Sequence, residues 1–206
     1  MITIKGILLS AIMLMAAVSA AYAQPVAFAE STPSQSGAIG LSSSAYRSWC
    51  CNAYDEQPGL LKLYVYHVYT PGATASQFMV SPAYIPNLTY LGETSPFDVV
   101  IGNSKTGIAI SYGACLTAPI LLLEIWYFGI GLSEPCSIVS VQPSPSAPSG
   151  NIEVADCSVP PNVLFATGAD LVINPDPFCS WWECFCDPDP VEQRSWGQIK
   201  SLYRGE

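Results

Sequence analysis

Residues 61–69 read Leu-Lys-Leu-Tyr-Val-Tyr-His-Val-Tyr, and they decide the fold class. β-Branched and aromatic side chains, which favour strands, fill this stretch, and it stops at the turn-forming residues 70–72, Thr-Pro-Gly. Residues 107–112 alternate between larger and smaller side chains, which predicts a half-buried strand. In 119–128 both alternating faces are mainly apolar, which predicts a central strand covered on both sides.

Further short apolar runs, divided by turn residues, follow the same pattern along the chain at 77–80, 84–91, 97–101, 137–141, 152–154, 163–166 and 171–173. Pro86 makes 84–91 an edge strand or a broken one. The intervals leave no room for the helices that parallel crossovers require. The sequence therefore predicts an all-β fold, an antiparallel β-sandwich of about eight to nine strands.

Composition excludes several classes of protein. Of 206 residues, 50% are hydrophobic and 11% are charged, the opposite of the balance in disordered chains. Sixteen acidic residues against seven Lys and Arg give a formal charge of −9, which opposes binding to phosphate backbones, so we expect no nucleic-acid partner. The single histidine, His67, excludes any site that needs two.

The first residues resemble an export signal. Lys5 precedes an apolar run at 7–18, and Ala-Tyr-Ala at 21–23 fits the cleavage rule for signal peptides, with 18–20 as a second site. The run is shorter than the ~20 residues that span a bilayer, although a retained anchor is the alternative. We expect residues 1–23 to be a signal peptide, no membrane span after cleavage, and a secreted, periplasmic or cell-surface protein.

The mature chain divides into three parts. Residues 24–45, rich in Ser, Ala, Gly and Pro, are expected to be a flexible leader, and 46–190 the β-sandwich domain. Residues 191–206 are expected to form a tail helix, with Ser195 as its N-cap and Gln198 at the capping-box position. Such a short helix is marginal alone and needs a surface to dock on. Its apolar face comprises Trp196, Ile199, Leu202 and Tyr203.

An even number of cysteines behind a signal peptide predicts a disulfide framework. Neighbours 50 and 51 are expected to have distant partners, whereas 115 and 136 could clip the ends of one apolar segment. Three thiols within 179–186 lack the spacing of a zinc site, so we expect neither a metal nor a cofactor. The eight are Cys50, Cys51, Cys115, Cys136, Cys157, Cys179, Cys184 and Cys186.

Residues 173–176, Ile-Asn-Pro-Asp, precede a cysteine-rich loop and the tail Ser-Trp-Gly-x-Ile-Lys-x-Leu-Tyr-Arg at 195–204. Together with 149–157, these motifs resemble the ends of uncharacterised secreted bacterial proteins, over roughly residues 98–204. The resemblance implies a bacterial exported protein. It brings no known activity and no site residues, and the recurring tail suggests an anchoring or sorting role.

Two residues are candidates for catalysis. His67 lies in a strand and no Gly-x-Ser-x-Gly elbow occurs, so we expect it to be structural. Glu124 lies in the most apolar strand, where burial would raise its pKa, as in a general acid. A second acid such as Asp98 would suit glycoside hydrolysis. The alternative is that Glu124 meets water or a hydrogen-bond partner.

The acids at 183–189, with Asp176, lack the ordered series of a calcium hand and are expected to form a solvated loop. Trp181 and Trp182 could bind a sugar or a partner, or cover the disulfide-rich loop.

We expect a non-catalytic surface, structural or binding module with no catalytic residue. Its weak candidate binding residues are Trp181, Trp182, Trp196, Ile199, Leu202 and Tyr203, and its partner is expected at the cell surface or in self-association through the tail. The alternatives are a secreted hydrolase that acts on carbohydrate through paired carboxylates, and a self-assembling extracellular subunit.

Overall fold

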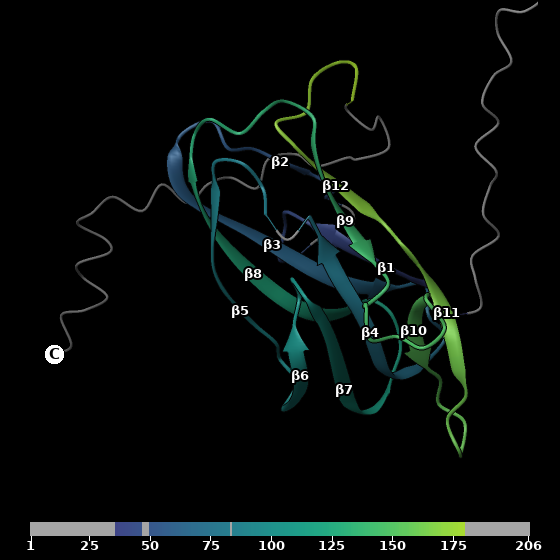
Figure 1. Cartoon of the computed structure of the whole chain (residues 1–206). Coiled ribbons are helices and arrows are strands. Elements are labelled where there is room, and N and C mark those ends of the chain that lie inside the picture. Colours follow the sequence, from purple (N-terminus) through teal and green to yellow (C-terminus); the bar gives the residue numbers. More distant parts are fainter. Residues whose placement is uncertain (1–35, 47–49, 83, 180–206) are drawn as a thin grey trace, which may run out of the picture. The chain divides into compact units, whose positions relative to one another are not determined.

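The computed structural model describes residues 36–46, 50–82 and 84–179 (Figure 1). These residues form twelve strands and no helix. In chain order the strands are β1 (Ala38–Ser42), β2 (Asn52–Ala53), β3 (Pro58–Val68), β4 (Ala73–Ser81), β5 (Leu88–Thr94), β6 (Val99–Asn103), β7 (Gly107–Leu116), β8 (Ile120–Ile130), β9 (Ser137–Gln142), β10 (Ile152–Ala155), β11 (Val163–Gly168) and β12 (Asp170–Ile173).

The strands form two layers joined along β1 (Figure 1). One layer has the order β1-β3-β8-β5. In the other, β6 pairs with β7, β7 with β4, and β4 with both β10 and β9. β11 and β12, separated only by Ala169, continue the layer by pairing with β10 and β9. The prediction of an all-β sandwich is confirmed.

Two details of that prediction are wrong. The strands outnumber the eight or nine expected, because short pieces such as β2 carry no pattern of their own. The pairing is also mixed rather than purely antiparallel, since β1 runs parallel to β11 and β2 parallel to β12.

The expected flexible leader, 24–45, is also corrected by the structure. β1 lies inside that range and pairs with β3 along its whole length. Ile39 and Leu41 are buried in the core, so sheet pairing and burial order a segment whose small residues have weak strand preference. The ordered body begins well before residue 46.

The core lies between the layers, where alternate residues of each strand face inward. Their side chains are less than about a tenth exposed and form one cluster. Representative members are Leu63, Val65 and Ile125 from one layer and Phe78, Ile108 and Ile110 from the other.

β8 is central, as expected, because it pairs with β3 on one side and β5 on the other. The expectation that both faces are covered is wrong. Leu122 is an extra residue opposite the Val65/Tyr66 step of β3, and this bulge brings both Leu122 and Leu123 into the core. Glu124 and Phe128 consequently belong to the outer face, where Phe128 is 44% exposed.

The disulfide prediction is confirmed for the described cysteines, none of which is free. Cys115 bonds to Cys157 and Cys136 to Cys179, while the neighbouring cysteines 50 and 51 are also disulfide-bonded. The suggested link between Cys115 and Cys136 is wrong. β4 lies between β7 and β10, so the ends of those two strands meet beside its first residues, where Cys115 and Cys157 can join.

The signal peptide and the tail helix lie outside the described residues. Within the described ranges, no helix is long and apolar enough to cross a membrane.

Candidate functional site

A trough runs over the outer face of the layer that contains β4. Five adjacent strands, β6-β7-β4-β10-β11, line up two rows of paired residues there. Residues paired across a sheet point to the same face, so each row forms one cross-section of the surface. The first row is Val99, Ser111, Ala75, Ala155 and Val163, and the second is Ile101, Ala109, Gln77, Glu153 and Phe165.

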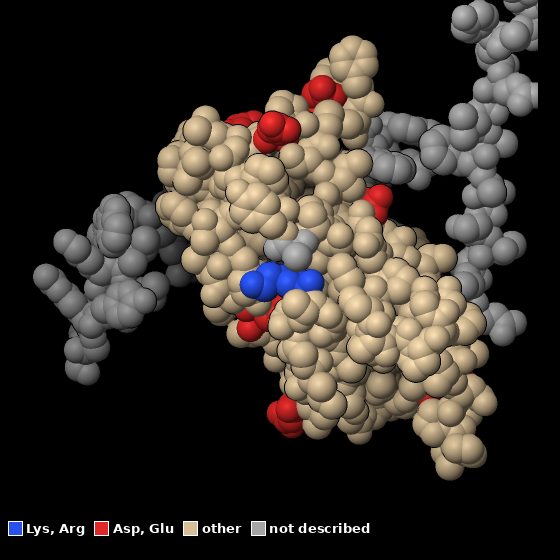
Figure 2. Space-filling view, in the orientation of Figure 1, with Lys and Arg blue, Asp and Glu red and all other residues tan. Residues whose placement is uncertain are grey.

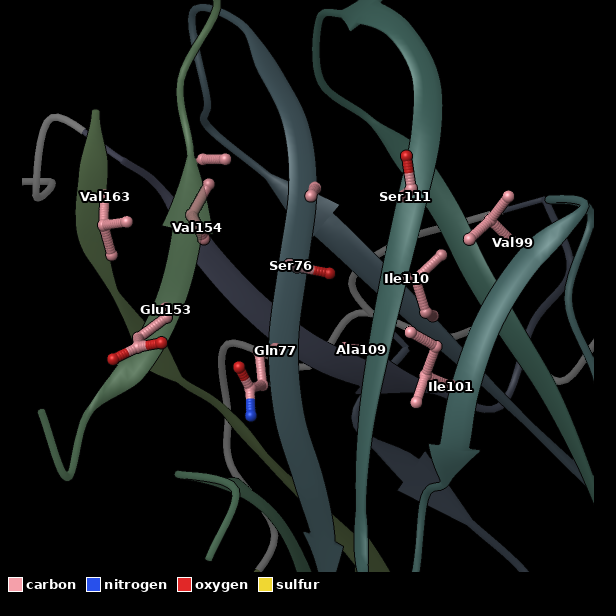
Figure 3. A pocket seen from close by; sticks show the side chains of 12 residues that line it. Ser76, Gln77, Val99, Ile101, Ala109, Ile110, Ser111, Glu153, Val154 and Val163 are labelled. Atoms are coloured by element: carbon pink, nitrogen blue, oxygen red, sulfur yellow. The ribbon is translucent and has the colours of Figure 1, made fainter. Parts of the chain in front are cut away.

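Large apolar side chains form the walls of the trough, and small ones form most of its floor. On β6, Val99 is 55% exposed and Ile101 is 70% exposed, while on β11 Val163 is 62% exposed. Between them the floor carries Ala and Ser side chains (Figure 3). The open hollow over this floor has a volume of about 250 Å³. A concave surface with exposed apolar side chains on both sides is typical of a binding site, whereas the solvent-facing side of a sheet is usually polar.

One end of the trough is polar. The side chains of Gln77 and Glu153 lie toward the same end in Figure 3. Gln77 donates from Nε2 to Ser146 Oγ at 2.8 Å, and Glu153 accepts from the Ser149 backbone N at 3.2 Å. The amide and the carboxylate are thus held by the 144–149 turn, which gives the apolar trough one fixed polar and acidic end.

The surroundings of the trough carry little charge. Figure 2 shows that uncharged atoms make up most of the visible face, with acidic atoms in scattered patches and one basic patch near the middle. Among the described residues that line the trough, the charged one is Glu153, whose carboxylate would repel an anionic ligand.

A second exposed face lies on the opposite layer, over β3 and β8. Leu60 pairs with Phe128 on this face and is 58% exposed. Its middle is polar, however: Lys62 Nζ lies 2.7 Å from Glu124 Oε1, and Trp126 Nε1 donates to the same oxygen at 2.6 Å. This cluster interrupts the apolar surface, so the trough is the better candidate for an apolar ligand.

The environment of Glu124 is the reverse of the one expected for a general acid. Partial burial raises the pKa of its carboxyl group. Hydrogen bonds from Lys62 and Trp126, together with the charge of Lys62, lower the pKa by more than burial raises it. The net pKa lies below the ordinary value for glutamate, so the carboxylate stays ionised and its partners hold it in place. The expected raised pKa is wrong, and the alternative that Glu124 has hydrogen-bond partners is confirmed.

His67 is fully buried between the layers. Its Nε2 lies 2.7 Å from the carbonyl oxygen of Ser36, and its Nδ1 lies 3.1 Å from the Tyr112 hydroxyl. Because a carbonyl can only accept, Nε2 carries the proton and Nδ1 accepts from Tyr112. Both ring nitrogens are bonded within the core, which confirms the structural interpretation.

One group of described residues has metal-ligand chemistry, namely Cys136, Cys179 and Asp176. The two sulfur atoms are bonded to each other, so neither is a thiolate. Asp176 Oδ1 accepts from the backbone N of Phe178 at 2.8 Å and of Cys179 at 3.0 Å. The carboxylate therefore caps the turn that carries the disulfide.

All of the predicted binding residues lie outside the described part of the chain, as do Cys184 and Cys186. They are Trp181, Trp182, Trp196, Ile199, Leu202 and Tyr203. No local pattern in the sequence indicates the trough. The alternation in 107–112 did place Ala109 and Ser111 on one face, but the walls come from strands whose register no local pattern reveals.

No protein-family model matches this sequence, and no curated protein does. Solved structures with a similar strand arrangement include the non-cellulosomal cohesin from the archaeon Archaeoglobus fulgidus, at 12% identity and a TM-score of 0.44, covering 66% of this chain and 89% of that one. The third ScaC cohesin from Acetivibrio cellulolyticus has 7% identity and a TM-score of 0.42, covering 66% and 97%. The cohesin module of a Clostridium perfringens family 33 glycoside hydrolase has 9% identity and a TM-score of 0.41, covering 61% and 92%. At this level the likeness is one of strand arrangement and extends to no partner.

Proposed function

We propose that this chain is an exported, non-catalytic binding module that takes an apolar element of a partner protein in the trough. The observation that carries the proposal is the floor of small side chains between two exposed apolar walls. Removing those walls from water stabilises a complex in proportion to the apolar area covered.

The width of the trough favours a helix as the occupant. β6 and β11 are separated by three strands, hence by four spacings of ~4.8 Å, or about 19 Å. This separation exceeds the ~10–12 Å diameter of one α-helix with its side chains, so a single helix fits between the walls. The partner element is therefore an amphipathic helix that lies along the strands with its apolar face down.

Two features support the remaining parts of the proposal. The disulfides of the described body favour an oxidising compartment, in agreement with the signal-like residues 1–23. The only histidine is sealed in the core, and Glu124 is held ionised by Lys62, so neither is poised for acid–base chemistry.

The test uses N-phenyl-1-naphthylamine, a neutral apolar fluorophore, as the probe. We expect saturable enhancement of its fluorescence by the wild-type protein, with amide chemical-shift changes on β6, β7, β4, β10 and β11. Ala75→Arg places a charge on the floor and is expected to weaken binding at least tenfold.

Thr94→Arg adds the same charge to an exposed position on β5, in the other layer, and is the matched control. It is expected to bind the probe like the wild type. Equal weakening by both variants, or unchanged binding by Ala75→Arg, would show that the trough is not the binding site.

A further inference from the structure

Two of the outermost strands, β5 and β6, have open edges, and these two edges differ. β5 pairs only with β8, and β6 pairs only with β7, among the described residues. β5 is protected in two ways that natural sheets use against association. The step between Tyr90 and Gly92 contains a bulge, and Glu93 accepts a hydrogen bond from the Ser104 backbone N at 2.9 Å.

β6 has none of these protections. Its five residues, Val-Val-Ile-Gly-Asn, include no charge and no proline, and they pair with β7 without a break in register. Side chains on both of its faces are exposed: Val99 by 55%, Val100 by 37% and Ile101 by 70%. An uncharged apolar edge whose outer side pairs with no other described strand is a template for another strand.

We propose that β6 pairs antiparallel with β6 of a second copy of this chain, with Val100 on the two-fold axis. The inference does not depend on the proposed function. A two-fold axis perpendicular to the sheet keeps each residue on its own face, so only registers that centre on a residue are allowed.

The choice of register follows from the side chains. With Val100 at the centre, Val99 of each copy lies opposite Ile101 of the other, so the two exposed wall residues of β6 cover one another. With Ile101 at the centre, Val99 would instead lie opposite the polar Asn103. The first register also places each Asp98 opposite Gly102 of the other copy, which keeps the two carboxylates apart.

The size of the contact sets its strength. A five-residue edge buries less than the ~800 Å² per partner of a standard stable interface. We therefore expect a reversible dimer whose population rises with protein concentration. In the dimer, the β6-containing layer of one copy and that of the other would form one continuous sheet. The two troughs would therefore open on the same side of the dimer.

The first experiment is sedimentation velocity of the full mature chain over a range of concentrations. We expect a monomer–dimer equilibrium in the wild type and a monomer in Ile101→Lys, because the new charges would face apolar side chains of the other copy. Val163→Lys adds a charge to the opposite wall, 62% exposed on β11, and is expected to dimerise like the wild type.

A monomeric wild type at every concentration overturns the proposal. So does a dimer that survives Ile101→Lys, because its interface then lies elsewhere, for example in the tail. Circular dichroism of each variant shows whether it has kept its fold.

The second experiment tests the register by single cysteines, since none of the described native cysteines is free. Val100→Cys places two thiols directly opposite each other across the axis, within the ~4.4–6.8 Å between Cα atoms that a disulfide needs. We expect it to form a covalent dimer on mild oxidation. Ile101→Cys is offset by two residues from its copy and is expected to remain uncrosslinked. The reverse result overturns the proposed register.

Discussion

Asp55 and Asn174, 119 residues apart in the sequence, share two hydrogen bonds. The Asp55 backbone N donates to Asn174 Oδ1 at 2.7 Å, and Asn174 Nδ2 donates back to the Asp55 carbonyl at 3.3 Å. The Asp55 carboxylate accepts from Ser133 Oγ at 2.6 Å and from the Gly131 backbone N at 3.0 Å. This hydrogen-bonded joint, made by Asp55, Asn174, Ser133 and Gly131, connects the segment before β3 to the β8–β9 loop and to the residue that follows β12.

Asn174→Ala should destabilise the fold by about 2–4 kcal/mol, because it leaves buried backbone groups of Asp55 and Ser133 without their partners. Asn174 also has a φ of 50°, which alanine adopts at a cost of ~1–2 kcal/mol. Asn174→Gly removes the hydrogen bonds without that strain and should be the less damaging change. Urea denaturation measures both, and equal stability of the alanine variant and the wild type would contradict the role of this joint.

His67 should make stability depend on pH near neutrality. Burial lowers its pKa below 6.5 in the folded state, and the hydrogen bond to Ser36 only partly offsets this. The unfolded chain therefore takes up a proton before the folded one, so the free energy of unfolding should fall as the pH drops below about 6.5. Measured between about pH 7.5 and pH 5.5, His67→Gln should be less stable than the wild type but should lack this slope. The same slope in both proteins would assign it to other groups.

Reduction of the Cys115–Cys157 disulfide should cost up to about 4 kcal/mol, the chain-entropy value for its separation of 42 residues. Gly72 packs directly on it, since a Cβ there would lie 2.8 Å from Cys157 Sγ. Gly72→Ala should therefore destabilise the wild type more than it destabilises a Cys115→Ala/Cys157→Ala variant. A double-mutant cycle by thermal denaturation gives the coupling, and strict additivity would contradict it.

The ion pair of Lys62 and Glu124 should contribute little to stability. Lys62 is 43% exposed, and pairs of this kind are worth about 0.2–1 kcal/mol. Lys62→Met should lose that amount at neutral pH and raise the pKa of Glu124. Because the folded pKa of Glu124 is depressed below 4.5, the difference between variant and wild type should vanish as the pH falls through that lower pKa. Carboxyl NMR titration checks the pKa; a loss of several kcal/mol at neutral pH would mean that Lys62 has a further role.

Local patterns were enough to predict β3 and β7, because their side chains alternate within one strand and need no knowledge of neighbours. They were not enough for β1, whose sequence Ala-Ile-Gly-Leu-Ser has little strand preference and is ordered by β3 and β11. In β8 the pattern gave the right strand and the wrong faces, since a bulge at Leu122 is decided by pairing with β3.

The trough depends entirely on long-range register. Ala75 faces Ala155 only because β10 returns beside β4 after the intervening strands have been placed. The same holds for the pairing of Cys115 with Cys157, which follows from the positions of β7 and β10 on either side of β4. Composition could predict that disulfides form, but the partners are set by the fold.

The parallel pairing of β1 with β11 and of β2 with β12 has a consequence for biogenesis. Ala38 must wait for Thr167, and Asn52 for Val172, before their ladders can form. A polypeptide that emerges with its amino end first, from a ribosome or through a secretion channel, therefore holds its first strands incomplete until nearly all of the body has appeared. Products that stop early would expose those strands to aggregation and to proteases, so synthesis must run almost to the end before the two strands are paired on both sides.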